Sequence, residues 1–280
     1  MALNVRSTSV TRSTAKGFLD KQDIIVVEEP LEIRVGFGNE NNRDQVALSI
    51  TMRTPGEDQL LGLGFLFNEG VIDKYDQLIS IKHCDELGTK ESKENIVRAE
   101  LIPTRAFNPD KFKRNFYTTS SCGICGKASI ELIRQNHDEK PMLSKKVSMK
   151  TVSTLPSKLL SAQQVFKYTG GLHASGLFDL NGKLLSHYED IGRHNAADKL
   201  IGYLLMKNRL PAKDKILVLS GRISFELVQK AIRAGIPIVI AVGAPSSLAI
   251  DLAKEYGLTL IGFVRNEEAN IYVGSENIKA

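Results

Sequence analysis

The most constraining feature of this sequence is an alternation in its last third. Three uniformly apolar runs, at 215–220, 236–243 and 258–264, are separated by two amphipathic segments at 224–235 and 246–257. Strands without a polar face are typical of a sheet covered on both sides, and parallel strands with short connections require right-handed crossovers. The pattern therefore predicts an α/β domain, which we place at residues 151–280.

The residues before this alternation add further elements to the same domain. We expect a helix at 161–169 and a β-hairpin at 170–185, because Asn181-Gly182 is a favoured two-residue turn between apolar runs. A well-patterned helix is predicted at 193–207.

The N-terminal part predicts a smaller α+β domain, at residues 1–115. Segments 23–36 and 95–102 have strand character, and 58–67 is a compact helix candidate that begins with an acidic residue. The first 20 residues are polar and rich in Ser, Thr and Arg, so we expect a flexible N-terminal arm, with a transit peptide as the alternative.

A third part, residues 116–150, is predicted to hold a mobile loop with a CxxC motif, then a helix and a connector. The helix candidate covers 127–136, and the polar, Lys-rich connector covers 138–160, overlapping the next domain.

Composition limits the class of protein. The 280 residues are 42% hydrophobic and 25% charged, with three cysteines and a formal charge of +5. This is an ordinary globular composition without a disulfide framework, and we expect a cytoplasmic protein with no membrane span. The positive charge predicts an anionic partner, such as a phosphorylated cofactor, an acidic protein or nucleic acid. No nucleic-acid-binding module is apparent, so we expect no nucleic-acid partner.

The strand-to-helix turns of the C-terminal domain are candidate anion sites. LSGRISFE and VGAPSSLA both lead from an apolar strand through glycine into a Ser-led helix, and Arg222 and Arg265 follow strands at the same predicted edge. Such turns direct backbone N–H groups and helix N-termini towards anions. No GxGxxG or Walker lysine motif is present, which argues against a dinucleotide dehydrogenase and a P-loop NTPase. Turn and cap residues without a ligand are the alternative.

Polar residues are unusually dense at 187–199. They are His187, Glu189, Asp190, Arg193, His194, Asn195 and Asp198. Asp190, His194 and Asp198 are spaced by four residues, so on a helix they would lie near one another. His173 lies between small residues, where a ligand could approach closely. These features favour a functional site, although each residue alone is more often a cap or a solvated side chain.

Cys122 and Cys125 form the CxxC motif, and the third cysteine is Cys84. A structural zinc site needs four ligands, and two cysteines supply only half of them. The motif follows an irregular basic segment and not a strand, which disfavours a thioredoxin-like dithiol. A zinc deaminase is disfavoured because its H-x-E and P-C-x-x-C elements are missing. A reactive nucleophile remains favoured, since a helix N-terminus, Lys127 and Arg114 would lower a thiol pKa; inert loop cysteines are the alternative.

Six blocks together resemble the FdhD family of formate dehydrogenase accessory sulfurtransferases. They are SSCGICGKASIE, GGLHASGLFD, EDIGRHNAADKLIG, LSGRISFELVQKA, GIPIVIAVGAPSSLAIDLA and TLIGFVRNEEANIY. The resemblance covers roughly residues 25–275, and the ordered set of blocks is far more specific than CxxC alone.

The resemblance implies a cytidine-deaminase-like α/β/α sandwich with a smaller N-terminal α+β domain, in a homodimer. It implies that Cys122 accepts persulfide sulfur from a cysteine desulfurase, with Cys125 assisting, and that the sulfur passes to the molybdenum bis(molybdopterin guanine dinucleotide) cofactor before its insertion into formate dehydrogenase. The family's cofactor-contacting segment corresponds here to Phe263, Val264, Arg265, Asn266, Glu267 and Glu268. We expect Arg222, His173 and His194 to contribute to the same cofactor site. A cofactor-binding chaperone without sulfur transfer is the alternative function.

Overall fold

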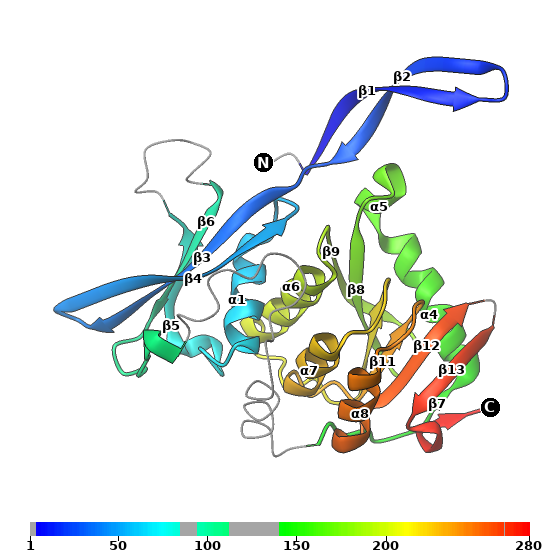
Figure 1. Cartoon of the computed structure of the whole chain (residues 1–280). Coiled ribbons are helices and arrows are strands. Elements are labelled where there is room, and N and C mark those ends of the chain that lie inside the picture. The colour runs from blue at the N-terminus through cyan, green and yellow to red at the C-terminus, as the bar shows by residue number, and fades with distance from the viewer. Residues whose placement is uncertain (1–3, 85–93, 112–139, 266) are drawn as a thin grey trace.

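The computed structural model of the chain describes residues 4–84, 94–111, 140–265 and 267–280 (Figure 1). The CxxC cysteines Cys122 and Cys125, the predicted helix at 127–136 and Asn266 lie outside the described residues.

A six-stranded sheet forms the centre of the C-terminal part. Its strand order is β13-β12-β11-β10-β8-β9. The strands are β8 (His173–Asp179), β9 (Leu184–Asp190), β10 (Lys215–Leu219), β11 (Ile238–Ala241), β12 (Thr259–Arg265) and β13 (Glu268–Val273). The strands β10, β11 and β12 are parallel, as the apolar alternation predicted, whereas β8 and β13 add antiparallel neighbours on either side. The predicted hairpin is confirmed as β8–β9, with Gly182 in the left-handed conformation that its turn requires.

Helices cover both faces of this sheet (Figure 1). They are α4 (Met149–Ala162) and α5 (Gln164–Thr169) on one face, and α6 (Arg193–Met206), α7 (Phe225–Arg233) and α8 (Ser247–Tyr256) on the other. The alternation along β10 shows why both faces are apolar: Ile216 and Val218 belong to the core beneath α4, while Leu217 and Leu219 belong to the core beneath α6 to α8. The α/β/α arrangement is therefore confirmed.

The N-terminal part contains a second sheet and one helix. The sheet order is β4-β3-β6-β5. These elements are β3 (Glu29–Asn39), β4 (Asn42–Arg53), α1 (Asp58–Asn68), β5 (Leu78–His83) and β6 (Ile96–Leu101). Helix α1 contacts β5 and β6 and also α6, so the smaller α+β unit rests on the helical face of the larger sheet (Figure 1).

Two glycines allow α1 and α6 to approach each other closely. A Cβ atom placed on Gly64 would lie 1.9 Å from the backbone oxygen of Asp198, and one on Gly202 would lie 2.0 Å from the backbone oxygen of Leu60. One continuous hydrophobic core includes Leu63 of α1 and residues of α6 to α8. The domain boundary near residue 115 stays a prediction, but the hydrophobic core does not divide between the two parts.

Two predictions about local structure are wrong. Residues expected to form a flexible arm instead form the antiparallel hairpin β1 (Val5–Thr14) and β2 (Gly17–Val26), which projects from the rest of the chain (Figure 1). The expected connector at 138–160 contains most of α4, whose side chains Val152, Leu155 and Leu159 are buried against the sheet.

Short elements complete the fold. They are β7 (Val147–Ser148), β14 (Ile278–Lys279) and the 3-10 turns Tyr75–Gln77, Pro109–Lys111 and Ser275–Asn277. The parallel pairing of β7 with β14 brings the C-terminal residues beside the start of α4. Among the described residues, no helix combines the length and the apolar character that crossing a bilayer requires.

Candidate functional site

A cavity of about 540 Å³ lies between α4 and α5 and the carboxyl ends of the parallel strands. Its apolar walls include Pro156, Leu160, Phe166, Ile191, Val218 and Val264, and its polar lining comprises Ser153, Ser157, Gln163, His173, Ser220 and Arg265. A largely apolar cavity with a few polar groups is the usual form of a small-molecule site. Its position at the carboxyl ends of parallel strands is also the usual one in α/β sheets.

Backbone hydrogen bonds join the three turns at this edge of the sheet. The N–H of Gly243 donates to the carbonyl of Gly221 (3.3 Å), the N–H of Ile223 to that of Ala244 (3.0 Å), and the N–H of Phe263 to that of Gly243 (3.2 Å). A side chain at 243 would meet the carbonyl oxygen of Gly221 at 3.0 Å, so glycine lets these turns pack closely. The turns after β10, β11 and β12 thus form one continuous rim, as the sequence predicted.

The end of β12 is irregular where it reaches the cavity. Its pairing with β13 shifts between Gly262 and Arg265, and Phe263 has a φ of 55°. A left-handed φ is strained for an aromatic residue, and such strain persists where the surroundings fix the conformation. The irregularity places a buried Val264 in the cavity wall and an exposed Arg265 beside it.

His173, the first residue of β8, lines the cavity. Burial lowers the pKa of its imidazole, and the nearby Arg193 and His194 lower it further, although Asp190 opposes them. A neutral imidazole can both donate and accept a hydrogen bond. His173 can therefore orient a ligand by hydrogen bonding but does not offer it a positive charge.

His194 makes a different set of contacts. Its Nε2 atom lies 3.0 Å from Ser224 Oγ and 3.8 Å from Glu226 Oε2. The contact with His194 is the main cause that lowers the pKa of Glu226 to about 2, and the Ser224 hydroxyl acts in the same direction. This cluster joins the start of α6 to the start of α7 and does not line the cavity.

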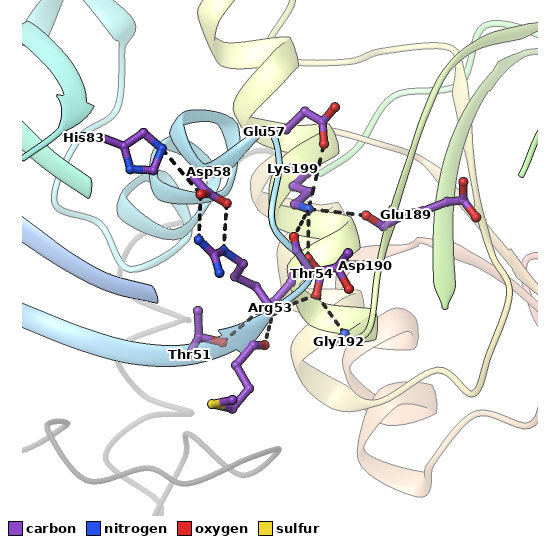
Figure 2. Close-up of polar contacts among 12 residues, drawn as sticks. Thr51, Arg53, Thr54, Glu57, Asp58, His83, Glu189, Asp190, Gly192 and Lys199 are labelled. Carbon is purple, nitrogen blue, oxygen red and sulfur yellow. Dashed lines mark hydrogen bonds and ion pairs between the residues drawn. The ribbon is translucent and has the colours of Figure 1, made fainter. Parts of the chain in front are cut away.

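A buried ion pair lies next to the cavity, between β9 and α6 (Figure 2). Lys199 Nζ lies 2.9 Å from Asp190 Oδ2, and the lysine is 1% exposed while the aspartate is fully buried. The ammonium group also donates to the backbone carbonyls of Thr54 (3.3 Å) and Glu189 (3.4 Å). The positive charge of Lys199 and the negative charge of Asp190 therefore compensate each other inside the protein.

The other oxygen of Asp190 fixes the turn between β9 and α6. It accepts hydrogen bonds from the N–H of Gly192 (2.8 Å) and from Asn195 Nδ2 (2.9 Å). Asn195 Nδ2 also donates to the carbonyl of Met52 (2.8 Å), and its Oδ1 accepts from Thr51 Oγ1 (3.2 Å). The turn that carries Ile191 into the cavity wall is thereby attached to the end of β4.

A second buried ion pair lies at the end of β4. Arg53 is 1% exposed and makes two 3.0 Å hydrogen bonds to the Asp58 carboxylate at the start of α1. His83 Nε2 lies 3.4 Å from Asp58 Oδ2 (Figure 2). Glu29 Oε2 lies 3.3 Å from Arg53 Nη1. We call Arg53, Asp58, Asp190 and Lys199 the buried ion-pair region.

The expectation that Asp190 shares a helix with His194 and Asp198 is wrong, because Asp190 ends β9 and α6 begins only at Arg193; His194 and Asp198 do lie one turn apart on α6. The three side chains have separate partners. Asp190 binds Lys199, His194 contacts Ser224, and Asp198 accepts from Lys230 (2.5 Å) and Asn68 (2.6 Å). The density of polar residues at 187–199 therefore reflects mainly structural contacts.

The remaining predicted site residues have these positions. His173, Val264 and Arg265 line the cavity, Arg222 lies in the adjoining rim, and Phe263, Glu267 and Glu268 are exposed residues of the β12–β13 hairpin. Cys84 is buried in the N-terminal part. The described residues contain no group of three or more His, Cys, Asp and Glu side chains placed to hold a metal ion.

Gln163 was missed by sequence reasoning. It lies between α4 and α5, lines the cavity and is 3% exposed, and its Nε2 atom has no hydrogen-bond partner among the described residues. A buried amide without a partner is unfavourable by about 1–3 kcal/mol. Together with Arg265 and the apolar walls, this unpaired donor suits a ligand that combines a planar polar group with an anion. No sequence motif marks the position.

Comparison with known proteins agrees with this fold. The profile of the FdhD/NarQ family matches residues 26–279. The chain is 45% identical over 271 residues to the "Sulfur carrier protein FdhD" of Mycolicibacterium paratuberculosis, covering 96% of this chain and 97% of that one. It is 44% identical over 257 residues to the protein of the same name from Picrophilus torridus, covering 91% and 92% of the two chains.

A solved structure shows the same overall fold. The crystal structure of a protein assigned as a formate dehydrogenase accessory protein, from Desulfotalea psychrophila, superposes with a TM-score of 0.74 at 23% identity. The superposition covers 99% of this chain and 100% of the other. The mixed α/β fold, the ordered sequence blocks and the match over almost the whole length lead to one conclusion: this chain belongs to the FdhD/NarQ family.

Proposed function

We propose that this protein is a sulfur carrier that supports the maturation of formate dehydrogenase. The curated relatives carry the name of sulfur carrier protein, and they match this chain along nearly its full length. The observation on which the proposal rests is the cavity at the carboxyl edge of the sheet, beside the basic rim at Arg222 and Arg265.

Sulfur would be accepted at Cys122, within the CxxC motif that the sequence retains. The Cys122 thiolate attacks the terminal sulfur of a donor persulfide, so that a new S–S bond forms and the donor cysteine leaves as a thiolate. Oxidation states are unchanged overall, and no separate oxidant is needed. Cys125 would assist by resolving or sharing the persulfide. A cysteine desulfurase is the corresponding donor class.

The cargo would be the molybdenum cofactor with two pterin guanine dinucleotides, which acts here as the substrate that receives the sulfur. The cavity supports this in three ways. Arg265 offers a charge for phosphate, the apolar walls suit a flat ring, and Gln163 offers an amide nitrogen that has no partner among the described residues. We propose that Arg222 and the strand-end turns extend the phosphate-binding rim, since exposed N–H groups and arginine both favour anions.

Phe263 to Glu268 and His194 complete the proposed cofactor segment. Phe263, Glu267 and Glu268 lie on the hairpin beside the cavity, and His194 supports the neighbouring rim through Ser224. We further propose that the protein acts in the cytoplasm, where thiols stay reduced, and that it works as a homodimer with formate dehydrogenase as the client.

Mass spectrometry of the peptide that holds Cys122 and Cys125 tests the proposal. After incubation with a cysteine desulfurase and cysteine, we expect one additional sulfur atom on Cys122, removable by a reductant. Cys122→Ala should abolish formate dehydrogenase activation, whereas Cys84→Ala is a matched control, because Cys84 is a buried cysteine that does not belong to the CxxC motif.

The alternative function, a chaperone that binds the cofactor without transferring sulfur, makes a different prediction. It requires guanine-nucleotide binding but not the cysteines. Absence of added sulfur on a folded protein, combined with full client activation by Cys122→Ala, would reject sulfur transfer and favour the chaperone.

A further inference from the structure

We propose that residues 164–171, which contain α5, form a hinged lid over the cavity, and that the carboxylate of Glu189 holds this lid closed. The lid contributes Phe166, Gly170 and Gly171 to the cavity lining, so its movement would open the cavity. The inference rests on the proposed function only in that the cavity takes up a ligand. It concerns how any such ligand enters and leaves.

Burial separates the lid from the rest of the domain. Gln163 before it and Leu172 after it are buried, with 3% and 5% exposure, whereas none of the residues 164–171 is buried. A segment without buried side chains gains little free energy from packing, and such segments open locally while the surrounding core stays folded. The lid is therefore the part of the cavity wall that can move.

The backbone on either side of α5 is suited to act as a hinge. Helix α4 ends at Ala162, and Gln163 has an extended backbone (φ −70°, ψ 100°) between the two helices. At the other end, α5 is followed by Gly170, with a left-handed φ of 64°, and then by Gly171. A Cβ atom placed on Gly170 would meet nothing within 4 Å. Because two adjacent glycines tolerate large changes of φ and ψ, this end can rotate in open space.

Glu189 attaches the lid to β9. Its two carboxylate oxygens accept hydrogen bonds from the N–H groups of Val165 (3.1 Å) and Phe166 (2.9 Å). These N–H groups lie in the first turn of α5, where no carbonyl of the helix can accept from them, and a negative charge is favourable there. Within the part of the chain that the structure describes, no other hydrogen bond connects residues 164–171 to another helix or strand.

The backbone of Glu189 belongs to the rigid part of the molecule. Its carbonyl accepts from Lys199 Nζ (3.4 Å), and its side chain points away from Lys199 (Figure 2). In the sheet, Glu189 pairs with Ala174 of β8. One residue therefore joins the buried ion-pair region to the movable lid. Removal of its carboxylate should release α5 without loosening β9.

Hydrogen exchange of the full-length chain, followed by mass spectrometry, tests the attachment. Glu189→Ala should make the amides of 164–171 exchange at least about tenfold faster, because two charge-assisted hydrogen bonds are lost. Glu189→Gln keeps one oxygen acceptor and should show a smaller increase. Glu40→Ala removes an exposed carboxylate from the β3–β4 turn and is the matched control, with no expected change.

The same experiment can overturn the inference in two ways. Unchanged exchange of 164–171 in Glu189→Ala would show that the carboxylate does not hold α5. Equal acceleration of α5, β8 and β9 would show a loss of stability in the whole domain and not the opening of a lid.

Stopped-flow kinetics with GDP as the probe tests whether the lid controls access to the cavity. A lid limits both entry and exit, so Glu189→Ala should raise the association and dissociation rate constants together, by about tenfold. A contact residue would change mainly the dissociation rate constant, and that result would overturn the lid. If the folded wild type does not bind GDP, the proposed cofactor site fails, whereas hydrogen exchange still decides whether α5 opens.

Discussion

The cavity and the buried ion-pair region lie next to each other but satisfy their polar groups differently. In the ion-pair region, Lys199 meets Asp190 and Arg53 meets Asp58, each pair almost completely buried. In the cavity, Gln163 has no partner for its Nε2 atom among the described residues, and Arg265 is exposed at the rim. Buried polar groups are thus paired within the protein in the first region, whereas the second region combines a buried amide nitrogen that is unpaired among the described residues with an exposed cation.

This difference distinguishes polar groups that stabilise the folded state from polar groups on which the folded state does not depend. Removing one member of a buried ion pair leaves an uncompensated charge and destabilises the fold. Removing an unpaired amide or an exposed cation takes away nothing on which the folded state depends. Substitutions in the two regions should therefore affect different measurements: stability in the first and ligand affinity in the second.

The largest expected effect is in the ion-pair region. Lys199→Met should lower the free energy of unfolding by about 3–5 kcal/mol, because Asp190 would be left buried without its counter-ion. Urea unfolding monitored by circular dichroism measures this loss. Lys207→Met, at the exposed end of α6, is the matched control and should change stability by less than about 0.5 kcal/mol. An equal effect of the two variants would contradict the comparison.

The energetic coupling between Lys199 and Asp190 should give the next largest effect on stability. Asp190→Asn should destabilise less than Lys199→Met, since asparagine keeps an oxygen for Gly192 and Asn195. The double variant should lose less than the sum of the single losses, with a coupling of about 0.5–3 kcal/mol. A double-mutant cycle in urea measures this quantity, and strict additivity would show that the pair does not interact.

The cavity should respond in the opposite way. Arg265→Ala should weaken GDP binding about tenfold and make it less sensitive to salt, while the free energy of unfolding changes by less than about 0.5 kcal/mol. Calorimetry at two salt concentrations measures both effects. Arg209→Ala, an exposed arginine at the end of α6, serves as the control. A large loss of stability in Arg265→Ala would place this arginine with the structural group.

The smallest expected effect concerns Glu226, which lies in the first turn of α7 and belongs to neither region. Its pKa is lowered from the ordinary range of a glutamate to about 2, mainly through the contact with His194. A depressed carboxyl pKa adds stability above the unfolded value, and that stability is lost as the pH falls from about 5 to about 2. Glu226→Gln should flatten the acid limb of the stability profile. Parallel profiles for the two proteins would show that the pair adds nothing.

Sequence patterns predicted most of the C-terminal fold. Buried strands such as β10 and β11 are continuous apolar runs, and helix α7 ends next to Gly235, which has the expected left-handed φ. These signals are local, so a single sequence is sufficient to read them. The common edge of Arg222 and Arg265 also followed from the predicted parallel order of the strands.

The failures have physical causes. The hairpin β1–β2 is exposed along most of its length, so it carries no alternation of apolar and polar residues. Helix α4 contains Pro156 and many polar residues, which hide its buried stripe. Asn195 and Lys199 also bind residues about 145 positions earlier in the chain, in the stretch from Thr51 to Thr54, and no local pattern reveals such a pairing.

The close approach of Gly64 and Gly202 has a consequence for how this chain can be divided. Because the two helices touch backbone to backbone, α6 has no side chain at Gly202 to cover its backbone where α1 crosses it. Leu200, Ile201 and Leu204 share one core with Leu63 and Leu66. A shortened protein that begins at residue 140 would expose this apolar surface to water. We therefore expect the C-terminal half, expressed alone, to aggregate, so the cavity should be studied only in the intact chain.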